Sequence, residues 1–196
     1  MSRLQRKYII LIRSLCWKNY GMLTVKLVNP EKKHHEMVED FIVEFFKYKS
    51  SFHGFDRLIE TASYQDWLTY IEKQKNENQI EESRVAAESL FATSKEEDII
   101  IGIVNIRYRL NEYLNNFGGH IGISIRPKYR NKGLGTEVLR LTLDRCKELN
   151  IEKVLITCNK SNQPSAKMIK KNGGVLAGEI IEEDGNIIQR YWIENK

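Results

Sequence analysis

A glycine-containing basic loop between an alternating strand and a long amphipathic helix constrains the fold of this chain more than any other feature. Apolar and polar residues alternate over 120–125, as in a half-buried strand, and a proline soon follows. Over 133–150, apolar residues recur at spacings of three and four, which predicts a helix with one buried face. The loop contains Gly133 and Gly135, which allow the backbone to turn tightly and to approach a ligand closely.

This loop is predicted to bind an anion. The first turn of a helix presents free N–H groups and the positive end of the helix dipole to the residues before it. Arg130, Lys132 and the Thr136 hydroxyl belong to the same segment and suit a pyrophosphate better than a single carboxylate. Neither the G-x-G-x-x-G pattern of dinucleotide-binding folds nor the G-x-x-x-x-G-K-[ST] pattern of nucleoside triphosphatases occurs. The spacing is instead Arg130-x-x-Gly133-x-Gly135.

Strand and helix patterns alternate along the rest of the chain and indicate a mixed α/β fold. Before the loop, strands are expected at 23–28, 85–92 and 99–110, and helices at 37–46 and after an N-cap at Ser63. After the long helix, the pattern predicts a continuous apolar strand at 154–158, a short helix from Ser161 or Asn162 to about Asn172, and a hairpin of strands at 175–181 and 187–193.

The positive charge is concentrated at the start of the chain. The formal net charge is +5, and the first 21 residues hold five basic and no acidic side chains, which leaves residues 22–196 neutral. A neutral body argues against a nucleic-acid-coating surface. We expect 1–21 to be a basic extension, flexible or helical, or the result of an upstream start site, and 22–196 to be a single domain. Two other interpretations of the extension are a basic amphipathic membrane-surface anchor and a nucleic-acid-binding segment with strongly salt-dependent binding.

The cysteines and the short apolar runs predict a cytoplasmic protein without a metal or a membrane span. Cys16, Cys146 and Cys158 are odd in number and lack metal-ligand spacing, and no secretory signal is evident. The apolar run at 8–12 is far shorter than the roughly 20 residues that a membrane helix needs. His34, His35 and His53 have no partner at metal-ligand spacing, so no metal is expected.

Together with these elements, the Arg130-x-x-Gly133-x-Gly135 loop resembles that of the GNAT superfamily of acyl-CoA N-acyltransferases. The resemblance covers about 22–196 and is most specific over 120–174. It implies a splayed, mixed but mostly antiparallel sheet with helices on both faces. The stretch 116–127, Asn-Phe-Gly-Gly-His-Ile-Gly-Ile-Ser-Ile-Arg-Pro, is similar to a group of predicted bacterial acetyltransferases.

The resemblance implies which residues bind acetyl-CoA. The pantetheine arm would bind to the main chain of Ile123, Ser124 and Ile125. The pyrophosphate would be wrapped by Arg130, Asn131, Lys132, Gly133, Leu134, Gly135 and Thr136. Asn162, with Ser165 three residues later, would bind the arm near the thioester. The alternative interpretations are a simple helix cap for Asn162 and a small packing residue for Ser165.

The catalytic groups are less clearly indicated, because Ile169 occupies the position where many family members carry a tyrosine acid. A thiol of pKa about 8.5 leaves without full protonation, whereas an amine of pKa about 10 must lose a proton, so a base is the stronger requirement. We expect His120 to be this base and Glu88 to be the second candidate. The alternatives are a strand-end histidine and a solvent-facing glutamate without catalytic roles. Cys158 is expected to be inert and buried.

The sequence therefore predicts an acetyl-CoA-dependent N-acetyltransferase that transfers the acetyl group directly to a primary amine in a ternary complex. The acceptor would be a small molecule or a peptide: a protein N-terminus, a lysine, a polyamine, an amino sugar and an aminoglycoside all fit. Neither a nucleic acid nor a membrane is expected as a partner, and a homodimer would be usual for the family. A catalytically idle acyl-CoA-binding module or sensor is the alternative, because of Ile169.

Overall fold

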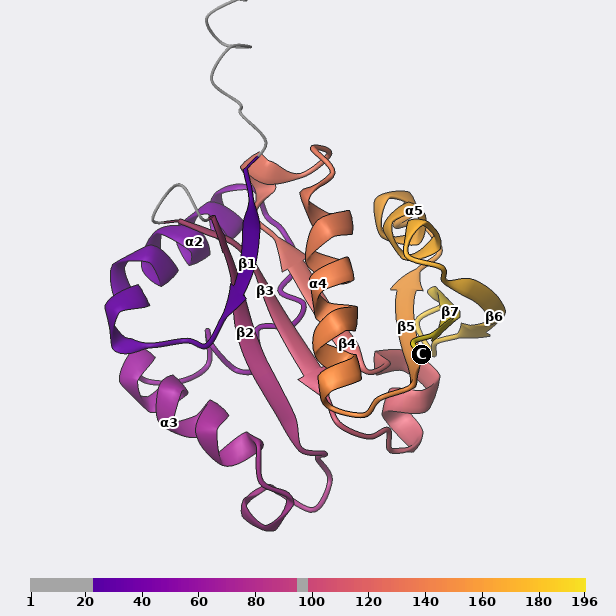
Figure 1. Cartoon of the computed structure of the whole chain (residues 1–196), viewed down its shortest axis with the longest axis horizontal. Helices are drawn as coiled ribbons and strands as arrows, with labels where there is room; N and C mark the ends of the chain where they lie inside the picture. The colour runs from indigo at the N-terminus through magenta and orange to yellow at the C-terminus, as the bar shows by residue number, and fades with distance from the viewer. Residues whose placement is uncertain (1–22, 95–98) are drawn as a thin grey trace, which may run out of the picture.

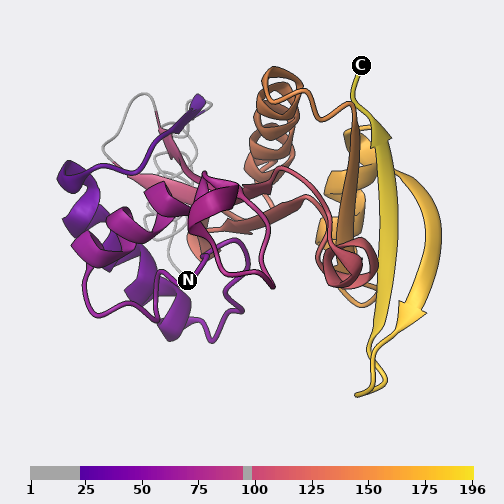
Figure 2. The ribbon, with the colours of Figure 1, turned by 90° about the horizontal axis from the view of Figure 1, so that it is seen from below.

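The computed structural model describes residues 23–94 and 99–196, within which seven strands form two antiparallel sheets. The first sheet has the order β1-β2-β3-β4, with bounds β1 Val25–Val28, β2 Ala87–Ser94, β3 Ile100–Arg107 and β4 Ile121–Ile125. The second sheet has the order β5-β7-β6, with bounds β5 Lys153–Asn159, β6 Val175–Ile181 and β7 Ile187–Glu194. The two sheets lie beside each other (Figure 2).

Helices cover both faces of the first sheet, as Figure 1 shows. The α-helices are α2 His35–Lys47, α3 Tyr64–Gln74, α4 Leu134–Glu148 and α5 Gln163–Lys171. Shorter helical segments are η1 Lys32–His34, η2 Glu77–Gln79, the π-helical η3 Leu114–Gly118 and η4 Pro127–Tyr129. Alternating side chains of β2 and β3 face two cores: Phe91 and Ile103 pack with α2 and α3, whereas Leu90 and Val104 pack with α4. This two-sided burial explains why β2 is buried along its whole length.

The expected fold class is confirmed, and most elements lie within a few residues of their predicted bounds. Ser63 is the N-cap of α3, where its Oγ accepts a hydrogen bond from the Asp66 backbone N–H at 3.1 Å. Strand β2 extends to Ser94, two residues beyond the predicted end at 92. The π-helix η3 was not predicted. The described part of the chain contains no helix that is long and apolar enough to cross a membrane. The expected extension 1–21, with Cys16, lies outside the described residues.

The two sheets meet at His120, immediately before β4. The His120 backbone N–H donates to the Leu155 carbonyl at 2.8 Å, and the Leu155 N–H donates to Nδ1 of His120 at 2.9 Å. Beyond this junction β4 and β5 share no ladder, because β4 pairs only with β3 and β5 only with β7. The edge of β4 that faces away from β3 therefore has no strand partner, and this is where the sheets separate.

Candidate functional site

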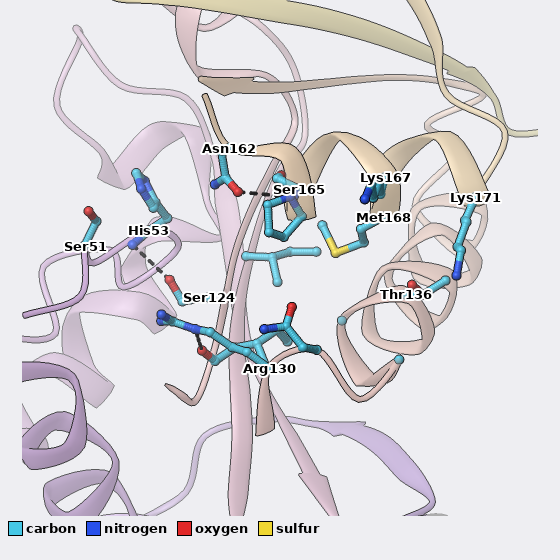
Figure 3. Close-up of a pocket in the computed structure, with 16 residues that line it drawn as sticks. Ser51, His53, Ser124, Arg130, Thr136, Asn162, Ser165, Lys167, Met168 and Lys171 are labelled. Atoms are coloured by element: carbon cyan, nitrogen blue, oxygen red, sulfur yellow. Dashed lines mark hydrogen bonds between the residues drawn. The ribbon is translucent and has the colours of Figure 1, made fainter. Parts of the chain in front are cut away.

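A cavity of about 520 Å³ lies where the two sheets separate (Figure 3). β4 contributes Ile123, Ser124 and Ile125 to its wall. The loop before α4 and the first turn of α4 contribute Arg130, Asn131, Gly133, Gly135 and Thr136. α5 and its N-cap contribute Asn162, Pro164, Ser165, Lys167, Met168 and Lys171. Ser51 and His53, from the loop after α2, complete the lining.

The structure brings together almost all the residues that the sequence assigned to the cofactor. Among them, only Lys132 and Leu134 do not line the cavity. The Lys132 ammonium lies 5.4 Å from the centre of the Tyr129 ring. Leu134 packs against the core between the first sheet and α4, called the α4-side core below. The residues that the family resemblance grouped therefore lie around one cavity, except for the side chains of Lys132 and Leu134.

The N-terminus of α4 has the geometry of an anion site. Gly133 is the N-cap in the left-handed conformation (φ 82°), which a glycine adopts without strain, and no side chain caps the helix. The N–H groups of Thr136 and Glu137 bond to the Gly133 carbonyl, which leaves those of Leu134 and Gly135 without a helical acceptor. These donors and the helix dipole attract a negative charge.

Gly135 keeps the cavity open next to this helix end. A Cβ atom at Gly135 would lie 3.2 Å from Sδ of Met168 and 3.4 Å from Cγ1 of Ile125. A methyl group would therefore be tight, and a larger side chain would occupy the space between β4 and α5. Glycine at this position preserves the passage between the two elements.

The charged side chains in the cavity lining are all basic: Arg130, Lys167 and Lys171. The guanidinium of Arg130 is bound within the protein: Nε donates to the Ile125 carbonyl at 2.8 Å, and a terminal nitrogen donates to Oγ of Ser50 at 3.0 Å. Both acceptors are uncharged, so Arg130 keeps its positive charge in the cavity lining. Lys167 and Lys171 have no ion-pair partner in the described part of the chain, so they add to this positive charge.

Asn162 is the N-cap of α5, as one of its two interpretations predicted. Its Oδ1 accepts a hydrogen bond from the Ser165 N–H at 3.2 Å, while the residue also lines the cavity. The cap uses the carbonyl end of the amide, so the NH₂ end can donate to a ligand. Capping and ligand binding are therefore compatible at this residue.

Cys158 is buried, as expected, and Ile169 is buried as well. Burial raises the pKa of the Cys158 thiol, although a hydrogen bond with Ser165 opposes this, so Cys158 is a protonated and poorly reactive thiol. Ile169 is fully buried in the α4-side core and does not line the cavity. The usual position of a tyrosine acid is therefore part of the core packing in this protein.

His120 does not fit the expected role of a general base. Its Nδ1 accepts the Leu155 N–H, so in the neutral ring Nε2 carries the proton and no lone pair is free. Burial and the charge of Arg107 lower the pKa of His120 to about 4. The side chain is 7% exposed and does not line the cavity. His120 is a structural link between the sheets.

Both expectations for Glu88, a catalytic role and a solvent-facing position, are wrong. Its side chain is 3% exposed, and Arg145 of α4 binds both carboxylate oxygens, at 2.7 and 2.9 Å. The residue lies outside the cavity lining. Its role in the structure is to tie α4 to β2.

Sequence reasoning assigned neither Ser51 nor His53, in the loop after α2, to the site. Gly54 in this loop has φ 74°, and a Cβ there would lie 2.5 Å from the Gly122 carbonyl oxygen. This close backbone contact places His53 and Ser51 beside β4. The glycine following His53 was the available signal, but its meaning depends on contact with a strand about 70 residues away. Within residues 23–94 and 99–196, no three His, Cys, Asp or Glu side chains are grouped as a metal site requires.

Comparisons with known proteins agree with this architecture. A family model described as an acetyltransferase (GNAT) domain matches residues 30–175. A curated protein of Bacillus subtilis (strain 168), named uncharacterized N-acetyltransferase YnaD, is 32% identical over 114 residues. The alignment spans 56% of this chain and 58% of that relative, little more than half of each.

Solved structures share the fold at low sequence identity. The ribosomal-protein-S5-alanine acetyltransferase of Vibrio fischeri has a TM-score of 0.66 at 17% identity, covering 90% of this chain and 96% of that one. A putative acetyltransferase from Salmonella typhimurium, yncA with its cofactor acetyl-CoA, scores 0.59 at 10% identity, covering 88% and 94%. The spermidine/spermine N-acetyltransferase SpeG of Vibrio cholerae scores 0.58 at 16% identity, covering 87% and 92%.

Proposed function

Because the chain belongs to the GNAT acetyltransferase family, we propose that it is an acetyl-CoA-dependent N-acetyltransferase that acts on a primary amine. The observation that carries this proposal is the shared cavity formed by the free edge of β4, the N-terminus of α4 and the N-cap of α5. A strand edge, a helix N-terminus and an amide side chain in succession fit the arm, the pyrophosphate and the thioester end of one extended cofactor.

In the proposed complex, the pyrophosphate binds to the N–H groups of Leu134 and Gly135 at the start of α4. Lys167 and Lys171 add positive charge near this end, where Thr136 also lies (Figure 3). The pantetheine arm runs along residues 123–125 and bonds to the backbone groups of this edge that neither β3 nor Arg130 binds, as an added strand would. Asn162 donates from its amide to the arm near the thioester.

The proposed reaction is a direct transfer in a ternary complex. The nitrogen lone pair of the neutral amine attacks the thioester carbonyl, the C–N bond forms, and the C–S bond breaks with its electron pair on sulfur. Backbone N–H groups stabilise the negative oxygen of the intermediate. Ile169 cannot act as an acid, and the buried thiol of Cys158 is not a nucleophile. The thiolate of coenzyme A therefore leaves without a proton from a tyrosine.

The lining favours an acceptor with a single amine over a polyamine. Two structural neighbours are named for acting on the alanine of ribosomal protein S5 and on spermidine or spermine. A polyamine carries further ammonium groups, which carboxylates would have to balance. Among the residues that the structure describes, no carboxylate lines the cavity. An N-terminal alanine of a peptide or a small monoamine therefore fits better.

The organisation of the whole protein is part of the same proposal. Residues 22–196 form one domain of a cytoplasmic enzyme, which fits the free thiols of Cys146 and Cys158. A homodimer would use the edge strand β6, whose Val175 and Ile181 are 69% and 71% exposed. Analytical ultracentrifugation of the wild-type chain and of Val175→Lys tests this association.

Ile169 supports a second candidate function, an idle acyl-CoA-binding module. Many family members carry a tyrosine acid at this position, whereas this chain has a buried isoleucine. Thiol release from acetyl-CoA distinguishes the two functions. We would assay a peptide with an N-terminal alanine, spermidine, a lysine peptide and an aminoglycoside as acceptors. Acceptor-dependent release with an acetylated product supports the enzyme. Tight acetyl-CoA binding, with no thiol released in the presence of any of these amines, supports the binding module.

A further inference from the structure

We propose that His53 is the general base that takes the proton from the acceptor amine; this inference rests on the proposed function. Nothing in the sequence pattern singled out this residue as catalytic. Its position in the cavity, its anchorage and the absence of competing groups carry the argument.

His53 lies at the end of the cavity where the transferred acetyl group would be. Figure 3 shows His53 and Ser51 on one side, near Asn162 and Ser124, whereas Thr136 and Lys171 lie on the opposite side. If the pyrophosphate is at the α4 end, the thioester end of the arm points toward His53. The attacking amine must approach the thioester from this side.

The loop that carries His53 is fixed to the strand that would bind the arm. The His53 N–H donates to Oγ of Ser124 at 3.0 Å, and Gly54 lies directly against Gly122. Before His53, Oγ of Ser50 accepts a hydrogen bond from Arg130. These contacts hold the backbone of His53 in one position relative to β4, as general base catalysis requires.

The imidazole is available to accept a proton at neutral pH. His53 is an exposed residue, but partial desolvation of its ring lowers its pKa, so the ring is neutral at pH 7. The charged side chains that line the same cavity are Arg130 of the β4–α4 loop and Lys167 and Lys171 of α5, and none of them is a carboxylate that would hold a proton on the ring. Neither ring nitrogen has a hydrogen-bond partner in the described part of the chain.

The other candidate bases are occupied or lie elsewhere. Nδ1 of His120 accepts the Leu155 N–H, and Nδ1 of His34 accepts the Glu31 N–H. The ring of His35 lies 3.3 Å from a carboxylate oxygen of Glu39 on α2, outside the cavity. Glu88 is bound by Arg145. His53 is therefore the titratable side chain in the lining that is neutral and can accept a proton.

The proton balance of the step is complete. As the C–N bond forms, the amine nitrogen becomes acidic and one proton passes to the free nitrogen of His53. The C–S bond then breaks, and the electron pair stays on sulfur, which is protonated from solvent. The imidazolium of His53 returns its proton to solvent through its exposed side.

Bromoacetyl-CoA tests the location of His53 without any acceptor. A nitrogen beside the bound acyl group attacks the methylene carbon, a C–N bond forms, bromide leaves, and the ring proton passes to solvent. Peptide mass spectrometry should find the adduct on His53 in the wild type and in His35→Gln, the matched control. The rate should fall on acidification with a midpoint below pH 6.5, and acetyl-CoA should protect. An adduct on another residue, with His53 unmodified, would overturn the proposal.

Calorimetry with acetyl-CoA separates this proposal from the proposed function. Wild-type protein that binds acetyl-CoA but is not alkylated on His53 contradicts only the role of His53. Protein that does not bind acetyl-CoA contradicts both proposals. His53→Gln should bind acetyl-CoA as the wild type does, within about twofold, because the cofactor contacts lie on the other elements.

Turnover then tests proton transfer itself. With a peptide carrying an N-terminal alanine and with spermidine as acceptor probes, His53→Gln should lower kcat about 100-fold or more. The KM for acetyl-CoA should change little, and the kinetic ionisation below pH 6.5 should disappear. A kcat within threefold of the wild type would overturn the proposal. If neither probe is turned over, the alkylation experiment decides.

Discussion

The backbone N–H of His53 donates a 3.0 Å hydrogen bond to Oγ of Ser124, a residue 71 positions later in the chain. This bond joins the loop after α2 to the central residue of the β4 segment that lines the cavity. Ser124 is 6% exposed, so its hydroxyl is a buried acceptor in a fixed position. The proposed acceptor side and the proposed cofactor side of the site are therefore one rigid structure.

The contact between Gly54 and Gly122 should be required to maintain this structure. In Gly54→Ala, the new Cβ would lie 2.5 Å from the Gly122 carbonyl oxygen, in addition to the strain of φ 74°. Gly185→Ala is the matched control, because φ is 85° there and nothing lies within 4 Å. Urea unfolding should show a loss of about 1 kcal/mol for the control and a clearly larger loss for Gly54→Ala. Equal losses would show that the backbone contact is unimportant.

Lys171 should contribute directly to cofactor affinity. The side chain lines the cavity next to the start of α4, whereas Lys170 points to the opposite side, 5.9 Å from the Tyr191 ring centre. We expect Lys171→Ala to weaken acetyl-CoA binding about three- to tenfold, with a smaller dependence on salt. Lys170→Ala should bind normally. Isothermal titration at two ionic strengths checks both variants, and equal effects would remove Lys171 from the site.

The elements that could be predicted from the sequence are those with local signals. The Ser63 cap, the long helix after Gly133 and the hairpin after Gly173 depend on spacing within a few residues. The segment 130–136, most of which lines the cavity, was singled out because its loop resembles a family motif. These signals do not require knowledge of the tertiary contacts.

The catalytic candidates were wrong where the outcome depended on distant partners. The hydrogen bond between His120 and Leu155 spans 35 positions, and the pairing of Glu88 with Arg145 spans 57. Both residues looked available in sequence, yet both are committed to holding the fold together. His53 was missed for the complementary reason, because the contact that brings it to the cavity is between two glycine backbones.

His120 should make the stability of the protein depend on pH. Burial lowers its pKa to about 4, whereas an unfolded histidine titrates near 6.5. Between these values the unfolded chain binds a proton that the folded chain does not, so stability falls as the pH drops from 6.5 to 4, by about 3 kcal/mol from this residue. His120→Asn, whose Oδ1 can replace Nδ1 as acceptor, should flatten this slope in urea unfolding across that range. An unchanged slope would contradict the assignment.

Glu88 should affect stability rather than cofactor binding. Glu88→Gln removes a charge that binds Arg145 through two hydrogen bonds, and we expect a loss of about 2 kcal/mol because Arg145 remains partly solvated. A double-mutant cycle with Arg145→Met measures the coupling energy by chemical unfolding. The acetyl-CoA dissociation constant of Glu88→Gln should stay within about twofold of the wild type. A large loss of affinity would return Glu88 to the site.

The central claim is that acetyl-CoA occupies the cavity between β4, α4 and α5. Calorimetric titration of acetyl-CoA into the wild type and into Gly135→Leu tests it most directly, with circular dichroism to verify that the variant is folded. A leucine at this position would fill the space beside Ile125 and Met168. We predict one binding site per chain in the wild type and a loss of measurable binding in Gly135→Leu. No binding by the wild type, or equal affinity in the two proteins, would contradict the account.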